Sequence, residues 1–170
     1  MKKFYKPIII FSVLLAVALT AVADESGAKK KEEKLPEFSL KSLDGKETVT
    51  DLTIKGKPAV FVVMQTACSA CRGEVNDLNA FYGREEYKNI QFYLVCVDVK
   101  PEASLPRYLK TYNVSIPALV DPEYTFGTKY SIPFSPATVF FDKDAKVAKI
   151  MKGYKAGSFE EMKEALDELK

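Results

Sequence analysis

Cys68 and Cys71 are the residues whose type and spacing most clearly indicate chemistry in this chain of 170 residues. They follow an apolar run of strand length and stand where a helical pattern begins. A helix N-terminus presents unpaired backbone N–H groups and the positive end of the helix dipole, and both stabilise a thiolate. We therefore expect Cys68 to have a lowered pKa and to attack disulfides. The i, i+3 spacing places Cys71 on the same side, where it can resolve a mixed disulfide.

Two other uses of this cysteine pair are open. A structural disulfide between Cys68 and Cys71 would close a very small loop and stabilise the fold little. A metal site would need further ligands, and the other sulfur donors are Cys96 and four methionines. Cys96 lies within an apolar strand pattern, which is typical of a buried core residue. The position of the pair between a strand and a helix favours a redox-active disulfide that needs no metal and no further cofactor.

The composition excludes several functional classes. The chain has no histidine, which excludes His-based triads, HExxH metalloprotease sites and His-ligated metals. Three cysteines are too few for a disulfide scaffold or a four-thiolate zinc site. The net charge is +2, but Lys2, Lys3 and Lys6 precede the first acid, Asp24, and the remainder carries 22 basic and 23 acidic residues. This near-neutral body argues against nucleic acid as a partner.

The N-terminus has the pattern of a secretory signal. Basic residues precede an apolar run that starts at Ile8 and ends at Ala23, and Ala21 with Ala23 forms an A-x-A pattern that predicts cleavage after Ala23. The alternative is an uncleaved membrane anchor, although the run is shorter than the ~20 residues that span a bilayer. Either way we expect a periplasmic or otherwise extracytoplasmic location, where cysteine pairs form disulfides.

Three segments follow from this interpretation. Residues 1–23 are the predicted signal peptide, and residues 24–34 are a charged segment without an apolar anchor, which predicts a linker. Residues 35–170 are the predicted folded domain. Because 47% of the chain is hydrophobic, this segment has enough apolar side chains for one compact core.

The domain alternates between strand and helix patterns. Residues 38–49 contain the turn signal Asp44-Gly45 and predict a β-hairpin. Continuous apolar runs at residues 57–65 and 89–99 predict strands buried on both faces, with a helix between them. A second helix, a β-hairpin at the segment 137–153 and a last helix follow. This order predicts an α/β fold with a partly parallel sheet covered on both faces.

The sequence predicts the capping residues of two helices. Ser104 is the expected N-cap of the second helix, with Pro106 in its first turn. Ser158 and Glu161 have the spacing of a capping box at the start of the last helix.

Residues 35–170 resemble the thioredoxin-like superfamily, in particular its extracytoplasmic TlpA/ResA-type branch. The segment 35–63 resembles the hairpin and Gly-Lys-Pro that open this branch, the CxxC follows at the expected place, and residues 130–147 resemble its later proline-containing signature. The resemblance implies a thioredoxin-like fold, with a central mixed sheet flanked by helices and an N-terminal β-hairpin extension.

The resemblance also implies a substrate-binding segment. Pro136 would be the cis-proline that faces the cysteine pair, and X-Pro is the peptide bond for which the cis form costs little. A cis bond would leave the backbone of Ser135 free to pair with an extended substrate segment. Phe134 then either lines the substrate groove or belongs to the core. The alternative is that Pro133 and Pro136 are ordinary loop prolines.

Glu74 matches a position at which the family has an acid that handles protons for the second cysteine. It lies three residues after Cys71, one turn further along the same helix face. The resemblance implies that Glu74 is a general base that takes the proton of Cys71. The alternative is an ordinary solvated helix glutamate.

The implied activity is that of an exported thiol–disulfide oxidoreductase acting on cysteine-containing exported proteins, among them apocytochrome c or another disulfide enzyme. The family's tryptophan before the first cysteine is replaced by Ala67, and Ser69-Ala70 carries no positive charge. We therefore expect only a moderate lowering of the Cys68 pKa and a reductant. A reductant would need a membrane electron donor.

Two other functions compete with this interpretation. A copper-delivery protein on this type of fold normally adds a His ligand, which this chain lacks. A peroxide-reducing relative would have a P-x-x-x-T-x-x-C pattern, whereas here Thr66 lies two residues before Cys68 and no proline stands in the preceding segment.

Overall fold

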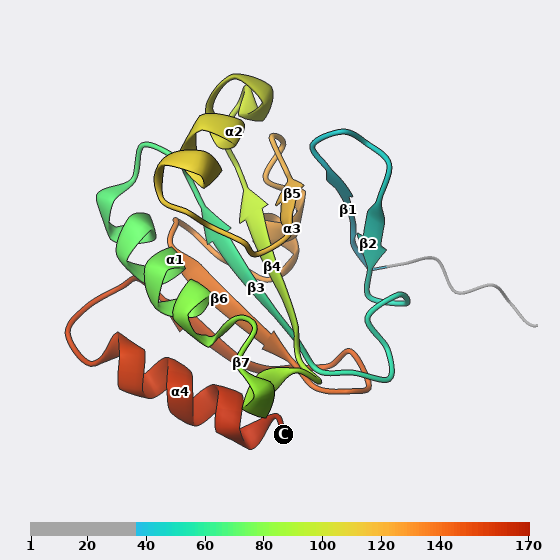
Figure 1. Cartoon of the computed structure of the whole chain (residues 1–170). Coiled ribbons are helices and arrows are strands. Elements are labelled where there is room, and N and C mark those ends of the chain that lie inside the picture. The colour runs from blue at the N-terminus through green and yellow to red at the C-terminus, as the bar shows by residue number, and fades with distance from the viewer. Residues whose placement is uncertain (1–36) are drawn as a thin grey trace, which may run out of the picture. The chain divides into compact units, whose positions relative to one another are not determined.

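The computed structural model describes residues 37–170, so the predicted signal peptide, the predicted linker and the first two residues of the predicted domain lie outside the described residues. These residues form a single seven-stranded sheet (Figure 1). The strands are β1 (Ser39–Ser42), β2 (Thr48–Thr50), β3 (Ala59–Met64), β4 (Gln91–Cys96), β5 (Ala118–Val120), β6 (Ala137–Phe141) and β7 (Val147–Lys152).

The sheet is mixed, in the order β2-β1-β5-β4-β3-β6-β7. The strands β3, β4 and β5 run parallel to one another, while β6, β7, β1 and β2 pair antiparallel. Parallel neighbours require helical crossovers, which accounts for the alternation in the sequence. The N-terminal hairpin β1–β2 extends the edge at β5, and Gly45 takes the positive φ of 71° at its turn. The predicted thioredoxin-like fold with a hairpin extension is confirmed.

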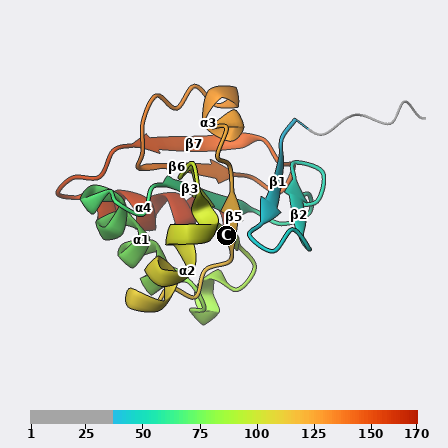
Figure 2. The ribbon, with the colours of Figure 1, turned by 90° about the horizontal axis from the view of Figure 1, so that it is seen from above.

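Helices cover both faces of the sheet (Figure 2). They are α1 (Ser69–Phe81), α2 (Pro101–Thr111), α3 (Thr125–Lys129) and α4 (Ser158–Glu168), with a short 3-10 turn at Glu85–Tyr87. One core lies beneath α1, α2 and α4, and the other lies beneath α3 and contains a cluster of aromatic rings around Phe61 and Phe126. Because β3 is buried at all six positions, its carboxyl end is a fixed support for the residues that follow.

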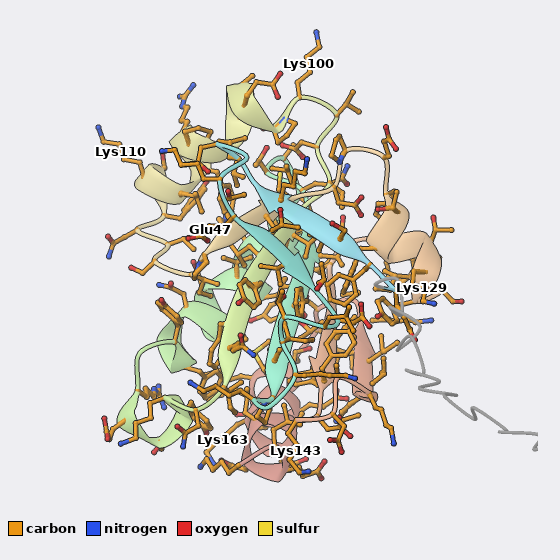
Figure 3. The ribbon with its side chains drawn as sticks, turned by 90° about the vertical axis from the view of Figure 1, so that its right-hand side faces the viewer. Glu47, Lys100, Lys110, Lys129, Lys143 and Lys163 are labelled. Atoms are coloured by element: carbon orange, nitrogen blue, oxygen red, sulfur yellow. A yellow bond between two sulfur atoms is a disulfide. The ribbon has the colours of Figure 1, made fainter. Side chains whose placement is uncertain are left out.

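Charged side chains project outward from the folded body, as Lys110, Lys129 and Lys143 show (Figure 3). Among residues 37–170, no helix is long and apolar enough to cross a membrane.

The predicted start of the second helix was wrong. The helix α2 begins at Pro101, three residues before Ser104, and Pro106 lies inside it. Pro101 suits the first helical position because the N–H that proline lacks has no intrahelical acceptor there. Ser104 does not cap the helix: its hydroxyl donates to Asp98 at 2.6 Å.

The predicted capping box of the last helix was also wrong. The residue before α4 is Gly157, with a left-handed backbone and no side-chain cap. The hydroxyl of Ser158 accepts the backbone N–H of Lys155, and the carboxylate of Glu161 pairs with Lys149 at 3.2 Å. Neither side chain is therefore free to bond the first amides of the helix.

Candidate active site

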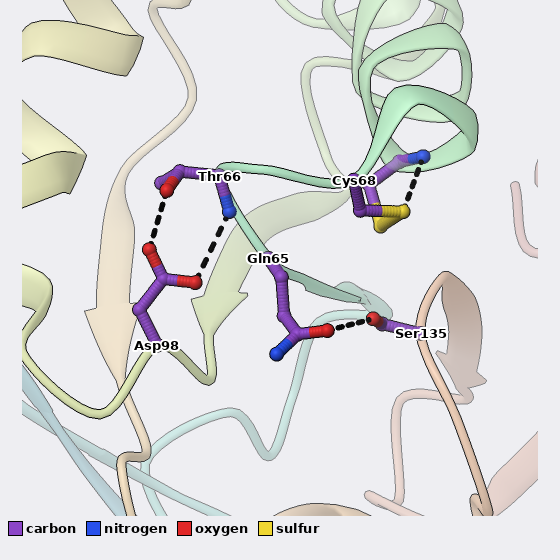
Figure 4. Close-up of a disulfide and its surroundings, with 6 residues drawn as sticks. Gln65, Thr66, Cys68, Asp98 and Ser135 are labelled. Atoms are coloured by element: carbon purple, nitrogen blue, oxygen red, sulfur yellow. Dashed lines mark hydrogen bonds between the residues drawn. A yellow bond between two sulfur atoms is a disulfide. The ribbon is translucent and has the colours of Figure 1, made fainter.

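Cys68 and Cys71 form a disulfide at the junction between β3 and α1. Cys68 is the N-cap of α1, and its sulfur accepts the backbone N–H of Cys71 at 3.1 Å (Figure 4). The Cα atoms lie 5.2 Å apart, within the normal range for a disulfide. The predicted position at a helix N-terminus is confirmed, and the same N–H group remains available to a Cys68 thiolate when the bond is reduced.

The two sulfurs differ in exposure. Cys71 is fully buried against the core, whereas Cys68 is half-buried and lies at the rim of the same core. A partner sulfur from another protein can therefore reach Cys68 but not Cys71. The structure gives the two cysteines unequal access, which is what an attacking and a resolving residue require.

Asp98 fixes the loop that carries Cys68 (Figure 4). Its carboxylate accepts the backbone N–H of Thr66 at 3.2 Å and the Thr66 hydroxyl at 2.5 Å, and it also accepts the hydroxyl of Ser104. These bonds join the end of β3, the end of β4 and α2. Sequence reasoning missed Asp98, because nothing in the local pattern distinguishes it from a loop acid.

The segment around Pro136 lies beside this loop. The peptide bond between Ser135 and Pro136 is cis, as predicted. The hydroxyl of Ser135 donates to the side-chain oxygen of Gln65 at 3.1 Å, which ties the segment to the loop three residues before Cys68 (Figure 4). Phe134 is 53% exposed, so it does not belong to the core. Gln65, Phe134 and Ser135 line a hollow of about 300 Å³.

Glu74 is fully buried, which excludes a solvated helix glutamate. It projects from α1 onto β6, where the hydroxyl of Thr138 donates to its Oε1. Its other oxygen, Oε2, has no hydrogen-bond partner among the described residues. The pKa of Glu74 is raised from 4.5 to about 7. Burial is the main cause, the hydrogen bond from Thr138 opposes the rise, and the nearby charge of Asp77 adds to it.

Tyr154 covers this part of α1 from the loop between β7 and α4. Its hydroxyl donates to Asp77 at 2.7 Å, and its ring lies so close to Gly73 that a Cβ there would come within 2.5 Å of it. Glycine at position 73 therefore allows the ring to pack over the helix backbone. Thr138 and Tyr154 were not identified from the sequence; the position of Thr138 two residues after Pro136 was the one available signal.

Cys96 and the side chain of Arg72 make their contacts with other parts of the fold. Cys96 is fully buried in β4, as predicted for a core residue, and burial raises the pKa of its thiol to about 11. Arg72 points toward Tyr112: its guanidinium donates to the Tyr112 hydroxyl at 3.3 Å and lies over the ring.

Comparison with known proteins agrees with this geometry. The profile of the AhpC/TSA family matches residues 32–150. The chain belongs to the AhpC/TSA family. Among curated relatives, the thiol-disulfide oxidoreductase ResA of Halalkalibacterium halodurans is 27% identical, over 99% of this chain and 95% of the relative. ResA of Geobacillus thermodenitrificans is 25% identical, over 97% of this chain and 94% of the relative.

Solved structures show the same fold. StoA from Bacillus subtilis has a TM-score of 0.62 at 18% identity, over 75% of this chain and 94% of StoA. A secreted Mycobacterium tuberculosis disulfide oxidoreductase has a TM-score of 0.64 at 20% identity, over 78% of this chain and 96% of that chain. The ResA relatives and the cysteine pair together identify this member of the family as a thiol–disulfide oxidoreductase of the TlpA/ResA type.

Proposed function

We propose that this protein is an exported reductant of disulfides in cysteine-containing client proteins, with the Cys68–Cys71 pair as its redox group. The observation that carries the proposal is the unequal pair at the start of α1: an accessible sulfur that caps the helix and a buried sulfur beside it. Candidate clients are apocytochrome c and other disulfide enzymes. A membrane electron donor would return the pair to the dithiol state.

The first step uses Cys68. In the reduced protein its thiolate, stabilised by the N–H of Cys71 and the helix dipole, attacks one sulfur of the client disulfide. The bond between the two client sulfurs breaks, and a mixed disulfide forms between Cys68 and the client. The first client sulfur leaves as a thiolate and takes a proton from solvent.

The second step uses Cys71 and Glu74. Glu74 accepts the thiol proton of Cys71, for which its open Oε2 is available. The Cys71 thiolate attacks Cys68, the internal disulfide closes, and the second client sulfur leaves as a thiolate, which takes up the proton that Glu74 received from Cys71. Counted from the dithiol, the protein gives up two electrons, the proton that Cys68 lost to solvent on ionisation and the proton of Cys71, and the client gains two electrons and two protons. A pKa of about 7 allows Glu74 to take and release this proton near neutral pH.

The surroundings of the pair support the reducing direction. Ser69 and Ala70 bring no positive charge between the cysteines, and the guanidinium of Arg72 is engaged by Tyr112. A thiolate with little extra stabilisation makes a dithiol the better electron donor. We expect a reduction potential below about −180 mV, the value of protein disulfide isomerase, and a higher measured potential would contradict the reducing role.

The export signal and the fold support an extracytoplasmic location. The N-terminal pattern predicts a cleaved signal, and one of the structural relatives is described as secreted. N-terminal sequencing of the protein from a fractionated native host tests this, with a new N-terminus at Asp24 as the expected result.

No contact among the described residues of the site supports a copper-delivery protein or a peroxide reductase. Within residues 37–170, no group of three or more Cys, Asp or Glu side chains is arranged to hold a metal ion. The hydroxyl of Thr66, the threonine nearest to Cys68 in sequence, is directed to Asp98.

A trapping experiment tests the proposal. The variant Cys71→Ser should accumulate as a mixed disulfide with its client through Cys68, because the resolving sulfur is absent. Cys68→Ser should trap nothing, and Cys96→Ser, which changes a buried thiol outside the pair, should behave as the wild type. Equal trapping by all three variants would overturn the assigned roles.

A further inference from the structure

The two residues that follow β7 join the cis-proline segment to α1. Gly153 has a left-handed backbone, with a φ of 77°, and its N–H donates to the carbonyl oxygen of Pro136 at 2.9 Å. The next residue, Tyr154, lies on α1, where its ring packs over Gly73 and its hydroxyl donates to Asp77 at 2.7 Å. The chain at Tyr154 is therefore held from two sides, by the cis-proline segment and by the helix that carries the resolving cysteine.

Asp77 has a negative charge that no cation neutralises. Among residues 37–170, the Tyr154 hydroxyl is the one hydrogen-bond donor to its side chain, and no Lys or Arg pairs with it. Asp77 lies one helical turn after Glu74, so the two carboxyl groups are neighbours on one face of α1. Because Asp77 is half-buried, water and salt screen its charge less than that of an exposed acid. A like charge at this position disfavours the ionised form of the buried Glu74.

Within residues 37–170, the elements packed against Glu74 bring no other charge that acts on it. The strand β3 contributes apolar side chains, and β6 contributes the neutral hydroxyl of Thr138. On α4, Glu160 acts on Tyr154 and is not among the groups that shift the pKa of Glu74. Burial is the largest cause of the raised pKa of Glu74, and the charge of Asp77 adds to it.

We propose that Asp77 and Tyr154 are positioning residues for the transfer of the Cys71 proton to Glu74. Tyr154 holds the Asp77 carboxylate beside Glu74, and the charge of Asp77 makes Glu74 a stronger acceptor of that proton. The proton passes from the Cys71 sulfur to a Glu74 oxygen, and neither Asp77 nor Tyr154 gains or loses one. This inference rests on the proposed function, because it concerns the second step of that mechanism.

Asp77→Asn removes the charge but keeps the shape of the side chain and an oxygen for the Tyr154 hydroxyl. The pKa of Glu74 in the oxidised protein should fall, as measured by NMR titration of its carboxyl carbon. The rate of the second step rises with pH as Glu74 ionises, so the midpoint of this rise should move to lower pH by about half a unit. Rapid quenching of the mixed disulfide between about pH 5 and pH 9 measures this midpoint.

Glu160→Gln is the matched control, because it removes an exposed acid that acts on Tyr154 but not on Glu74. It should leave both the pKa of Glu74 and the midpoint of the second step unchanged. An unchanged pKa of Glu74 in Asp77→Asn, or equal shifts in Asp77→Asn and Glu160→Gln, would overturn the inference.

Tyr154→Phe separates the positioning of Asp77 from a structural role. Phenylalanine keeps the ring over Gly73 but leaves the Asp77 carboxylate without its donor and free to turn toward solvent. The pKa of Glu74 should therefore fall by less than in Asp77→Asn, and the double variant should match Asp77→Asn alone. A lower thermal midpoint with an unchanged pKa of Glu74, or two shifts that add in the double variant, would show that Tyr154 does not act through Asp77.

The pKa measurement needs no client, so a failure of this inference can be told from a failure of the proposed function. If Cys71→Ser traps a client while Asp77→Asn leaves the pKa of Glu74 unchanged, the proposed function stands and the inference is wrong. If Cys71→Ser traps no client, both are wrong.

Discussion

Thr138 on β6 holds one carboxyl oxygen of Glu74 on α1, 64 positions earlier in the chain, and leaves the other oxygen without a partner among the described residues. The carboxyl group is therefore fixed in orientation, buried, and open on one side. Burial favours its protonated form and the bond from Thr138 favours the charged form. The balance brings the pKa of Glu74 close to neutral pH, where a proton acceptor for Cys71 is most useful.

Replacing Glu74 by Gln should slow the second step of the reaction. The amide keeps the shape of the side chain but cannot take the Cys71 proton, so the mixed disulfide should live about 100-fold longer. Rapid quenching of single-turnover reactions measures this lifetime. The exposed Glu164→Gln is the control and should leave it unchanged. An unchanged lifetime in Glu74→Gln would remove Glu74 from the mechanism.

Glu74 should also make the stability of the oxidised protein depend on pH. Its folded-state pKa of about 7 lies above the usual 4.5, so the native state keeps a proton that the unfolded chain loses. The stabilising effect is complete below about pH 4.5 and is lost as the pH rises through about 7. The Glu74→Gln variant should avoid this loss, on the order of 3 kcal/mol in the free energy of unfolding. Urea unfolding between about pH 4 and pH 8 measures it, and parallel curves for both proteins would contradict it.

Thr138→Val should raise the pKa of Glu74 further. The valine has a similar shape but donates no hydrogen bond, so the contact that favours the charged carboxylate is lost. Thr138→Ser keeps the hydroxyl and should retain a value near 7. NMR titration of the Glu74 carboxyl carbon in each variant checks the order, and a lowered pKa in Thr138→Val would be inconsistent with this geometry.

Asp98→Ala should loosen the loop that carries Cys68. The backbone N–H and hydroxyl of Thr66 and the hydroxyl of Ser104 would lose their acceptor, at a cost of about 1–3 kcal/mol in the free energy of unfolding. Chemical unfolding of the oxidised protein measures this loss. Asp144→Ala, in an exposed turn, should cost much less. Equal losses in the two variants would show that Asp98 is not a structural link.

The sequence predicted those parts of the site that local patterns determine. The apolar run of β3 and the helical spacing after it placed Cys68 at the start of α1, and family resemblance added the cis bond at Pro136. The predicted N-caps of α2 and α4 were wrong because a side chain caps a helix only when no other group engages it. Asp98 binds Ser104, and Lys155 with Lys149 engages the two residues of the expected capping box.

Contacts between segments that are distant in the sequence could not be predicted from local patterns. The spacing of Glu74 after Cys71 left a solvated side chain open as the alternative to a catalytic one. The pairing of β6 with β3 decided between them, because it places Thr138 where its hydroxyl reaches Glu74 on α1. Tyr108 belongs to the buried face of α2, and only the packing around it leaves its hydroxyl buried without a hydrogen-bond partner in the described part of the chain.

Mapping of alkylation rates tests the central claim, that Cys68 is the accessible thiolate of an unequal pair. In the reduced wild type at neutral pH, iodoacetamide should label Cys68 at least about tenfold faster than Cys71, because the helix N-terminus stabilises its thiolate and because Cys68 is only half-buried whereas Cys71 is fully buried. Cys96 should react only after unfolding, and oxidation should protect both members of the pair. Labelling of Cys68 no faster than Cys71 or Cys96 would contradict the account.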